Sequence, residues 1–181
     1  EVGPDGAVWV ADWYSYIIQH NPVPSGFNNG AGNAYETDLR DFTHGRIYRV
    51  AYKNAPAYQP FNLSMNDRKS LLAALQSDNL FWRMHAQRML VERGQKDVVP
   101  DLIEILKNQQ PDALGINPSA IHALWTLEGL NALTPEILSI GLSHTAPEVV
   151  RNTIKAMPEN DWSVNQIIAR NLLRHADPLV V

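Results

Sequence analysis

Gly3-Pro4-Asp5-Gly6-Ala7-Val8-Trp9-Val10-Ala11-Asp12 opens a β-hairpin that His44-Gly45-Arg46-Ile47-Tyr48-Arg49-Val50 completes. The Pro-Asp-Gly sequence is typical of a tight turn, because proline fixes φ and glycine accepts backbone conformations that other residues avoid. After the turn the side chains alternate, with Val8 and Val10 on one face and Trp9 on the other, and the second run alternates in the same way. We therefore expect two strands paired antiparallel, with Asp12 and Arg46 close together.

The apolar residues change to helical spacing after residue 64. Seven successive stripes predict helices of about ten to fifteen residues each. Pro118, Pro135 and Pro147 mark three helix starts, and Asp97 and Asp161 are expected to cap two others. The stripes are Leu71, Leu72 and Leu75; Trp82, Ala86, Met89 and Leu90; Val98, Val99, Leu102, Ile103 and Leu106; Ile121, Leu124 and Trp125; Ile137, Leu138 and Leu142; Val149, Val150, Thr153, Ile154 and Met157; and Val164, Ile167, Ile168 and Leu172.

The helical region contains an internal repeat. Leu75-x-x-Asp78-x-x-x-Trp82-Arg83 corresponds to Leu142-x-x-x-x-Pro147-x-x-Val150-Arg151 and to Leu173-x-x-x-Asp177-Pro178-x-Val180, and His85-Ala86 recurs as His122-Ala123. A repeat of roughly 30 to 40 residues built from two helices resembles the HEAT family. The resemblance implies a mainly α fold, a HEAT-like α-solenoid of antiparallel helix pairs, preceded by the short antiparallel hairpin.

Composition and charge exclude several classes of function. The 181 residues carry a net charge of −4 and no basic cluster, so binding to nucleic acid through phosphate contacts is disfavoured. The absence of cysteine excludes disulfides, thiolate metal sites, cysteine nucleophiles and covalent haem attachment. No apolar run reaches the ~18 residues of a membrane span.

Both ends of the chain have the character of internal sequence. Glu1-Val2 leads directly into the first turn without an initiator methionine or a leader, and Asp177-Pro178 is typical of a helix start. We expect the chain to be a segment of a longer protein.

The long insertion between the two expected strands, residues 13–45, is the best candidate for a functional loop. Candidates for lining a polar cleft are Asp12, Tyr14, His20, His44 and Arg46, and weaker candidates for metal ligands are Asp12, Asp38 and Asp41. Each has an ordinary alternative: Asp12 caps its strand, His44-Gly45 shapes a turn, and residues 25–33 form a flexible Asn- and Gly-rich loop. No residue is assigned a catalytic role.

Polar and aromatic residues of the helical region have structural explanations. The two histidines occupy equivalent repeat positions, which indicates packing or hydrogen bonding between helices. The two arginines are expected to bond neighbouring turns or acidic groups, and the three tryptophans to anchor the core. The glutamate has no second carboxylate for acid-base catalysis. These residues are His85, His122, Arg83, Arg151, Trp82, Trp125, Trp162 and Glu128.

The hairpin sequences also resemble a family. The two runs quoted first are similar to membrane-bound dehydrogenase-like proteins related to the quinoprotein glucose and sorbosone dehydrogenases. Two further stretches share this resemblance: Ile17-Ile18-Gln19-His20-Asn21, which lies between the two runs, and Leu124-Trp125-Thr126-Leu127-Glu128-Gly129-Leu130 in the helical region. The resemblance implies that residues 1–60 are part of the last blade of a β-propeller and residues 61–181 its HEAT repeats. His20 and His44 match the last-blade pattern. The resemblance implies an exported bacterial protein, periplasmic or at the cell surface.

The same resemblance implies oxidation of sugars or alcohols by pyrroloquinoline quinone (PQQ) and calcium, with electrons passed to haem. Those groups require several blades and a further domain, so this chain alone is expected to hold no cofactor and to be inactive. The first hypothesis is a connector and docking segment whose partners are the other domains of its parent protein. The alternative is a HEAT-repeat adaptor without a redox role, which binds a protein or a polysaccharide on its solenoid surface.

Overall fold

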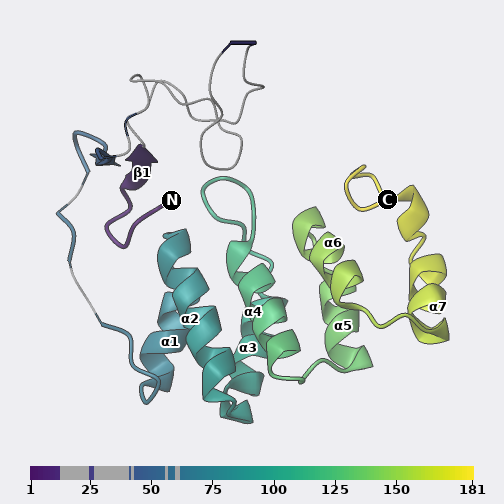
Figure 1. Ribbon diagram of the computed structural model, residues 1–181. Coiled ribbons are helices and arrows are strands. Elements are labelled where there is room, and N and C mark those ends of the chain that lie inside the picture. Colours follow the sequence, from purple (N-terminus) through teal and green to yellow (C-terminus); the bar gives the residue numbers. More distant parts are fainter. Residues whose placement is uncertain (13–24, 27–40, 42, 56, 60–61) are drawn as a thin grey trace. The chain divides into compact units, whose positions relative to one another are not determined.

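A computed structural model describes residues 1–12, 25–26, 41, 43–55, 57–59 and 62–181 (Figure 1). Contacts divide the chain into two compact units, Glu1–Gln59 and Pro60–Val181. The first contains a two-stranded antiparallel sheet and the second contains seven α-helices in the described part of the chain. The protein is therefore mainly helical with a small antiparallel sheet.

The hairpin has the predicted strands and register. β1 (Val8–Asp12) pairs antiparallel with β2 (Arg46–Val50), and Asp12 lies opposite Arg46, as predicted. The first residues of the chain cover part of the other edge of β1: Val2 bridges to Val8, and Glu1 exchanges two backbone hydrogen bonds of 2.9 and 2.7 Å with Trp9. The Pro-Asp-Gly turn thus joins two antiparallel segments.

Asp5 holds this turn to the second strand. Its carboxylate accepts a 3.1 Å bond from the Ala7 N–H and a 2.6 Å bond from Arg49 Nε. The bond from Arg49 is the largest cause that lowers the pKa of Asp5. Gly6 has φ +77°, where a side chain would be strained, and a Cβ on Gly3 would lie 2.3 Å from the Trp9 ring. Both glycines are therefore required by the local geometry.

Helices α1 to α7 follow one another from residue 68 to residue 169. Their bounds are α1 Arg68–Ala74, α2 Leu80–Arg93, α3 Val99–Lys107, α4 Pro118–Gly129, α5 Pro135–Leu142, α6 Pro147–Ala156 and α7 Asp161–Ala169, with 3-10 turns η2 Lys96–Val98 and η3 Leu172–Arg174. The three predicted proline starts are confirmed, with Asn117 and Thr134 as side-chain caps for α4 and α5. The predicted length is wrong for several helices, because the closely spaced turns limit α1 to seven residues and α5 to eight.

The helices contact one another as successive pairs. α1 packs on α2, α3 on α4 and α5 on α6, while α2 contacts α4, α4 contacts α6 and α3 contacts α5. Figure 1 shows these pairs following one another across the helical unit. Most of the predicted stripes supply the core, including the fully buried Leu71, Leu90, Leu102, Leu124 and Val149. A smaller cluster joins α5 and α6 to the C-terminal segment through Leu142, Val150, Leu172 and Val180.

Three predictions about the helix ends and faces are wrong. Asn160 rather than Asp161 caps α7, and Asp97 lies inside η2 without a side-chain cap bond. Val164 and Ile168 of the last stripe are exposed, because no described helix packs on that face of α7. None of the helices among the described residues is long and apolar enough to cross a bilayer.

Candidate functional site

Three of the candidate cleft residues lie at the end of the hairpin where β1 finishes and β2 begins: Asp12, His44 and Arg46. Asp12 is the last residue of β1 and pairs with Arg46, the first residue of β2. Arg46 Nη1 donates a 2.8 Å hydrogen bond to the Tyr48 hydroxyl. Since residues two apart on a strand share a face, as do directly paired residues, Asp12, Arg46 and Tyr48 lie on the same face of the sheet.

Asp41 and His44 form a hydrogen-bonded loop just before β2. Asp41 Oδ1 accepts the backbone N–H groups of Thr43 and His44 at 2.9 and 3.0 Å, and Asp41 Oδ2 lies 2.7 Å from His44 Nδ1. The Thr43 N–H is the largest cause that lowers the pKa of Asp41 to about 2, so this carboxylate is charged at neutral pH. The contact with Asp41 Oδ2 holds the exposed imidazole of His44 through its Nδ1 atom.

The described part of the chain therefore brings Asp12, His44 and Arg46 to one end of the hairpin. Tyr14, His20 and Asp38 lie outside the described residues. Among the residues that are described, Asp12 and Asp41 belong to no group of three or more potential metal ligands. The end of the hairpin offers an imidazole held by a carboxylate and a guanidinium bonded to a tyrosine hydroxyl, and each of these groups can bind a polar or hydroxyl-bearing group.

His122 is a structural histidine between two helices. His122 Nδ1 on α4 lies 2.7 Å from Gln87 Oε1 on α2, which confirms hydrogen bonding between helices at this position. Burial, with a smaller contribution from the positive charge of Arg83, lowers the pKa of His122 to about 4. The imidazole is therefore neutral at pH 7 and serves as a hydrogen-bond donor in the α2–α4 interface.

Among the residues that the structure describes, His85 does not make the bond between helices that His122 makes, and Arg83 and Arg151 also differ from each other. His85 Nδ1 bonds the Phe81 carbonyl in its own helix at 2.8 Å, and its ring stacks on Phe81. Arg83 is buried and donates to the Ser77 carbonyl at 2.6 Å, in the turn before α2, as expected for an arginine that bonds a neighbouring turn. Arg151 makes no such bond to any residue that the structure describes. The arginine ladder therefore does not extend to α6.

The three tryptophans that were predicted to anchor the core are only partly buried. Trp82 is partly buried against the core, and Trp125 donates its Nε1–H to Asn152 Oδ1 on α6 at 2.9 Å. Trp162 lines a cavity of about 400 Å³ beside Glu128, between the α4–α5 and α6–α7 connections. All three rings therefore have one side facing solvent or a cavity.

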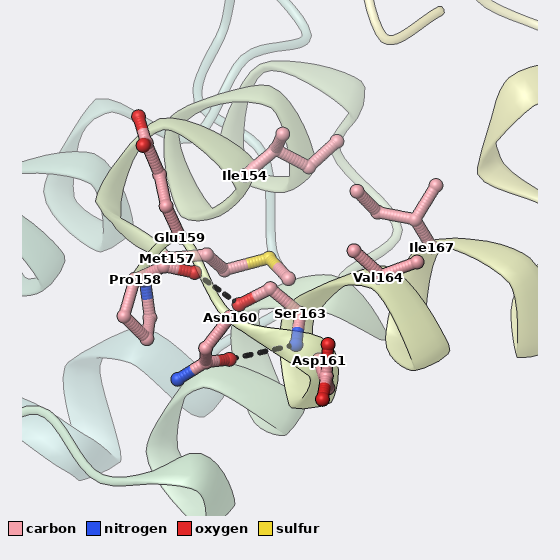
Figure 2. A pocket seen from close by; sticks show the side chains of 9 residues that line it. All are labelled: Ile154, Met157, Pro158, Glu159, Asn160, Asp161, Ser163, Val164 and Ile167. Atoms are coloured by element: carbon pink, nitrogen blue, oxygen red, sulfur yellow. Dashed lines mark hydrogen bonds between the residues drawn. The ribbon is translucent and has the colours of Figure 1, made fainter.

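Two further hollows lie in the helical unit. One of about 480 Å³ separates α6 from α7; Figure 2 shows Ile154 of α6 facing Val164 and Ile167 of α7 across it. Ser163 closes its floor, with Oγ donating to the Pro158 carbonyl at 2.5 Å and N–H donating to Asn160 Oδ1 at 3.1 Å. Most of its lining residues are apolar, and the charged ones are Glu159 and Asp161.

Sequence reasoning missed a groove of about 590 Å³ between α2 and α4. We call it the α2–α4 groove; its lining includes Leu80, Met84, Val91, His122 and Trp125. The predicted stripe of α2 identified its buried face, and the groove uses the opposite face, where Leu80 and Met84 are exposed. The signal available in the sequence was a second apolar series, Leu80, Met84 and Val91, whose spacing of four and seven residues brings all three to one helix face.

Comparison with known proteins gives a family match for the hairpin unit. Residues 1–54 match a family described as a domain of unknown function (DUF7133). No curated protein and no solved structure matches the chain. The family match includes the Asp41–His44 loop and both strands but none of the described helices, and its description assigns no activity.

Proposed function

We propose that this chain is a connector and docking segment of a larger exported protein of the sugar or alcohol dehydrogenase type. In this proposal residues 1–60 belong to the last blade of a quinoprotein-like β-propeller, and residues 61–181 form a HEAT-like solenoid that links the propeller to a further domain. PQQ, calcium and haem belong to other parts of the parent protein, and the segment itself is non-catalytic.

The observation that carries the proposal is apolar exposure on both faces of the hairpin. Val10 and Val50 on one face and Trp9 and Ile47 on the other are all exposed, and Ile47 retains 74% of its accessible surface. A two-stranded sheet with two apolar faces is only marginally stable in water by itself. Neighbouring strands and blades would cover these faces in a propeller, where each sheet packs against others.

The pattern of helix contacts supports the solenoid part of the proposal. Second helices of successive pairs contact each other, α2 to α4 and α4 to α6, and first helices do so from α3 to α5. Two parallel rows of helices, each in contact mainly with its neighbours, are what a helical repeat array requires. The surface of the row α2, α4 and α6 is then available for docking.

The end of the hairpin supplies a polar rim in this proposal. His44, held by Asp41, and Arg46, held by Tyr48, present an imidazole and a guanidinium. In the parent protein these groups would orient a polar substrate at the edge of the propeller channel. Neither is assigned the role of catalytic base.

The test compares this chain with the longer protein that carries it, in dye-linked oxidation of glucose and other sugars with added PQQ and calcium. We expect no turnover by the chain alone. In the longer protein, His44→Ala and Arg46→Ala should lower turnover, while the matched control His122→Gln should leave it unchanged, because His122 lies in the α2–α4 interface. Turnover by the chain alone, or equal losses in all three folded variants, would contradict the proposal.

The α2–α4 groove favours the second candidate function, an adaptor. Its exposed Leu80 and Met84 beside Trp125 suit an apolar protein segment better than a polysaccharide, because methionine and leucine side chains make no hydrogen bonds to hydroxyl groups. Met84→Glu would then abolish binding of the partner without unfolding the chain, since Met84 is exposed. A longer protein that lacks sugar oxidation but loses a bound protein through Met84→Glu would establish the adaptor.

A further inference from the structure

Glu128, near the end of α4, borders two hollows of the helical unit. It lines the α2–α4 groove of about 590 Å³ and also a cavity of about 400 Å³. We call the second hollow the Trp162 cavity, after the tryptophan in its lining. Because one side chain lines both spaces, the groove with Trp125 and the cavity with Trp162 meet at Glu128.

The charge of Glu128 is not compensated within these hollows. Its exposed carboxylate makes no ion pair and accepts no hydrogen bond from any residue that the structure describes. Arg88 and Glu92, which also line the groove, lie 3.6 Å apart and balance each other. In the Trp162 cavity Glu128 is the charged lining residue. The two hollows therefore present a negative charge at Glu128 that is available to a ligand.

His122 and Lys96 do not neutralise Glu128. His122 lines the groove but is neutral at pH 7, because burial lowers its pKa to about 4. Lys96 donates instead to the Asn131 carbonyl at 2.9 Å, just after α4. The last turn of α4 contains no basic residue, and the C-terminus of a helix carries a partial negative charge. The end of α4 therefore attracts a cation.

The tryptophans beside Glu128 suit a guanidinium group. Trp125 precedes Glu128 by three residues, so the two side chains lie on one face of α4. The Trp125 Nε1–H donates to Asn152 Oδ1 on α6 at 2.9 Å, which fixes the indole ring. A guanidinium pairs with a carboxylate through two parallel hydrogen bonds and stacks on aromatic faces, whereas the ammonium of lysine acts as a point charge. Arginine is therefore the side chain best matched to this position.

We propose that the α2–α4 groove and Glu128 dock a segment of a partner protein that combines apolar side chains with an arginine. The apolar side chains contact Leu80 and Met84, which are 43% and 56% exposed, and the arginine binds Glu128. The inference rests on the docking role in the proposed function and adds the chemistry of the partner. A protein segment is the occupant because a polysaccharide of neutral or acidic sugars offers no positive charge to Glu128.

The groove also sets the spacing between the apolar residue and the arginine. α2 and α4 end side by side, because a Cβ on Gly129 would lie 2.7 Å from Val91 Cγ2. Glu128 is therefore level with the end of α2, where Val91 follows Met84 by seven residues, or about 10 Å along the helix. A helical partner segment should place its arginine about seven residues from the apolar residue that contacts Met84, and an extended segment about three residues from it.

The test selects peptides from a phage-displayed library of random sequences, about 12 residues long, on the whole immobilised chain. We expect the selected peptides to share apolar residues and an arginine at this spacing. The same selection on Glu128→Lys should enrich an acidic residue in place of the arginine, because the charge at the end of α4 is then reversed.

Matched variants then measure the contribution of the carboxylate to binding of a selected peptide. Glu128→Gln should weaken binding by about tenfold or more, since hydrogen bonds to charged groups contribute more than neutral ones. Glu104→Gln is the control, because Glu104 is exposed on α3, contacts Lys107 at 2.8 Å and lines neither hollow. A peptide with glutamine in place of its arginine should bind the original chain and Glu128→Gln equally weakly. Urea unfolding should be nearly unchanged in both variants, because both side chains are exposed.

Selection of no peptide, or of peptides without a basic residue, would overturn the inference, as would equal binding by the original chain and Glu128→Gln. Retention of the chain on a polysaccharide resin, or its dimerisation in light scattering, would also overturn it if Met84→Glu abolished the effect, since the groove would then have another occupant. A peptide that depends on Met84 but not on Glu128 would leave the docking role intact. Sugar oxidation by the longer protein is measured separately, so failure of this inference is distinguishable from failure of the proposed function.

Discussion

His122 should make the stability of this protein depend on pH between about 6.5 and 4. Its imidazole is neutral in the folded protein because burial in the α2–α4 interface, together with Arg83, lowers the pKa to about 4 from a usual value of 6.5. The pKa is thus lower in the folded state than in the unfolded state. As the pH falls below 6.5 the unfolded chain binds a proton that the folded protein does not, so stability is complete above this range and decreases toward pH 4.

The size of the effect follows from the shift in pKa. A change from 6.5 to about 4 corresponds to at most about 3 kcal/mol. The ring is partly exposed, and solvent screening reduces this value, so we expect a loss of about 1 to 2 kcal/mol between pH 7 and pH 4.5 that is specific to His122. Substitution His122→Gln removes the titrating group and retains an amide donor for Gln87.

The assay is urea unfolding, followed by the helical circular dichroism signal at several pH values, for the original chain and for His122→Gln. The difference in unfolding free energy between the two should change by about 1 to 2 kcal/mol over this range, because contributions from other titrating groups cancel. His85→Gln is the matched control, since His85 bonds its own helix, and it should retain the pH dependence due to His122. An identical pH dependence in the original chain and in His122→Gln would refute the reasoning.

Three other predictions concern packing and the hairpin loop. Gly141→Ala should cost about 1 to 3 kcal/mol in urea unfolding, because its Cβ would lie 2.2 Å from Thr153 Oγ1, and Thr153→Ala in the same chain should recover part of the loss; an unchanged stability would contradict the close approach of α5 and α6. Leu124→Ala should cost about 2 to 5 kcal/mol and Val164→Ala less than about 0.5 kcal/mol, and equal losses would contradict the assignment of buried and exposed faces. Thr43→Val should raise the pKa of Asp41 from about 2 toward 3.8 in a carboxyl titration by NMR, since it removes the hydroxyl donor at 3.0 Å; an unchanged titration would show that this hydroxyl does not act on Asp41.

The hairpin was predictable from sequence because its signals are local. The Pro-Asp-Gly turn and the alternation of Val8, Trp9 and Val10 specify both the reversal of the chain and the strand. Pairing of Asp12 with Arg46 then follows from the alternation of the second strand. The additional pairing of residues 1–3 with β1 was not predicted, because those residues carry no strand pattern of their own.

The helix starts were equally predictable, whereas the exposure of helix faces was not. Pro118, Pro135 and Pro147 act locally, since proline is favoured in the first turn of a helix whatever lies around it. The stripe of α7 has the same helical spacing as the buried stripes, but spacing alone does not show whether another element covers it. The exposure of Val164 and Ile168 could therefore not be predicted from the sequence pattern.

The candidate site was predicted as a set of residue types, without its contacts. The sequence placed Asp41 among possible metal ligands and His44 among cleft residues, and the structure joins them to each other through a 2.7 Å contact. Their separation of three residues fits a compact hydrogen-bonded loop, in which the carboxylate binds the backbone N–H groups that follow it. Such a loop depends on backbone conformation, which the sequence of an insertion this long does not specify.

Polar side chains differ between the two units in their hydrogen-bond partners and in their exposure. In the helical unit many of them join helices or their connections: Glu148 Oε1 accepts the Asn117 N–H at 2.7 Å, and the Asn108 carbonyl accepts bonds from Asn117 and His144 at 2.6 and 3.1 Å. Groups committed to such bonds are costly to redirect toward a ligand, because a buried partner would be left unsatisfied. The hairpin unit instead presents His44 on its surface, held by a carboxylate that stays charged to about pH 2. The exposed polar groups considered for a polar rim therefore lie in the hairpin unit, whereas the exposed Leu80 and Met84 considered for docking lie in the helical unit.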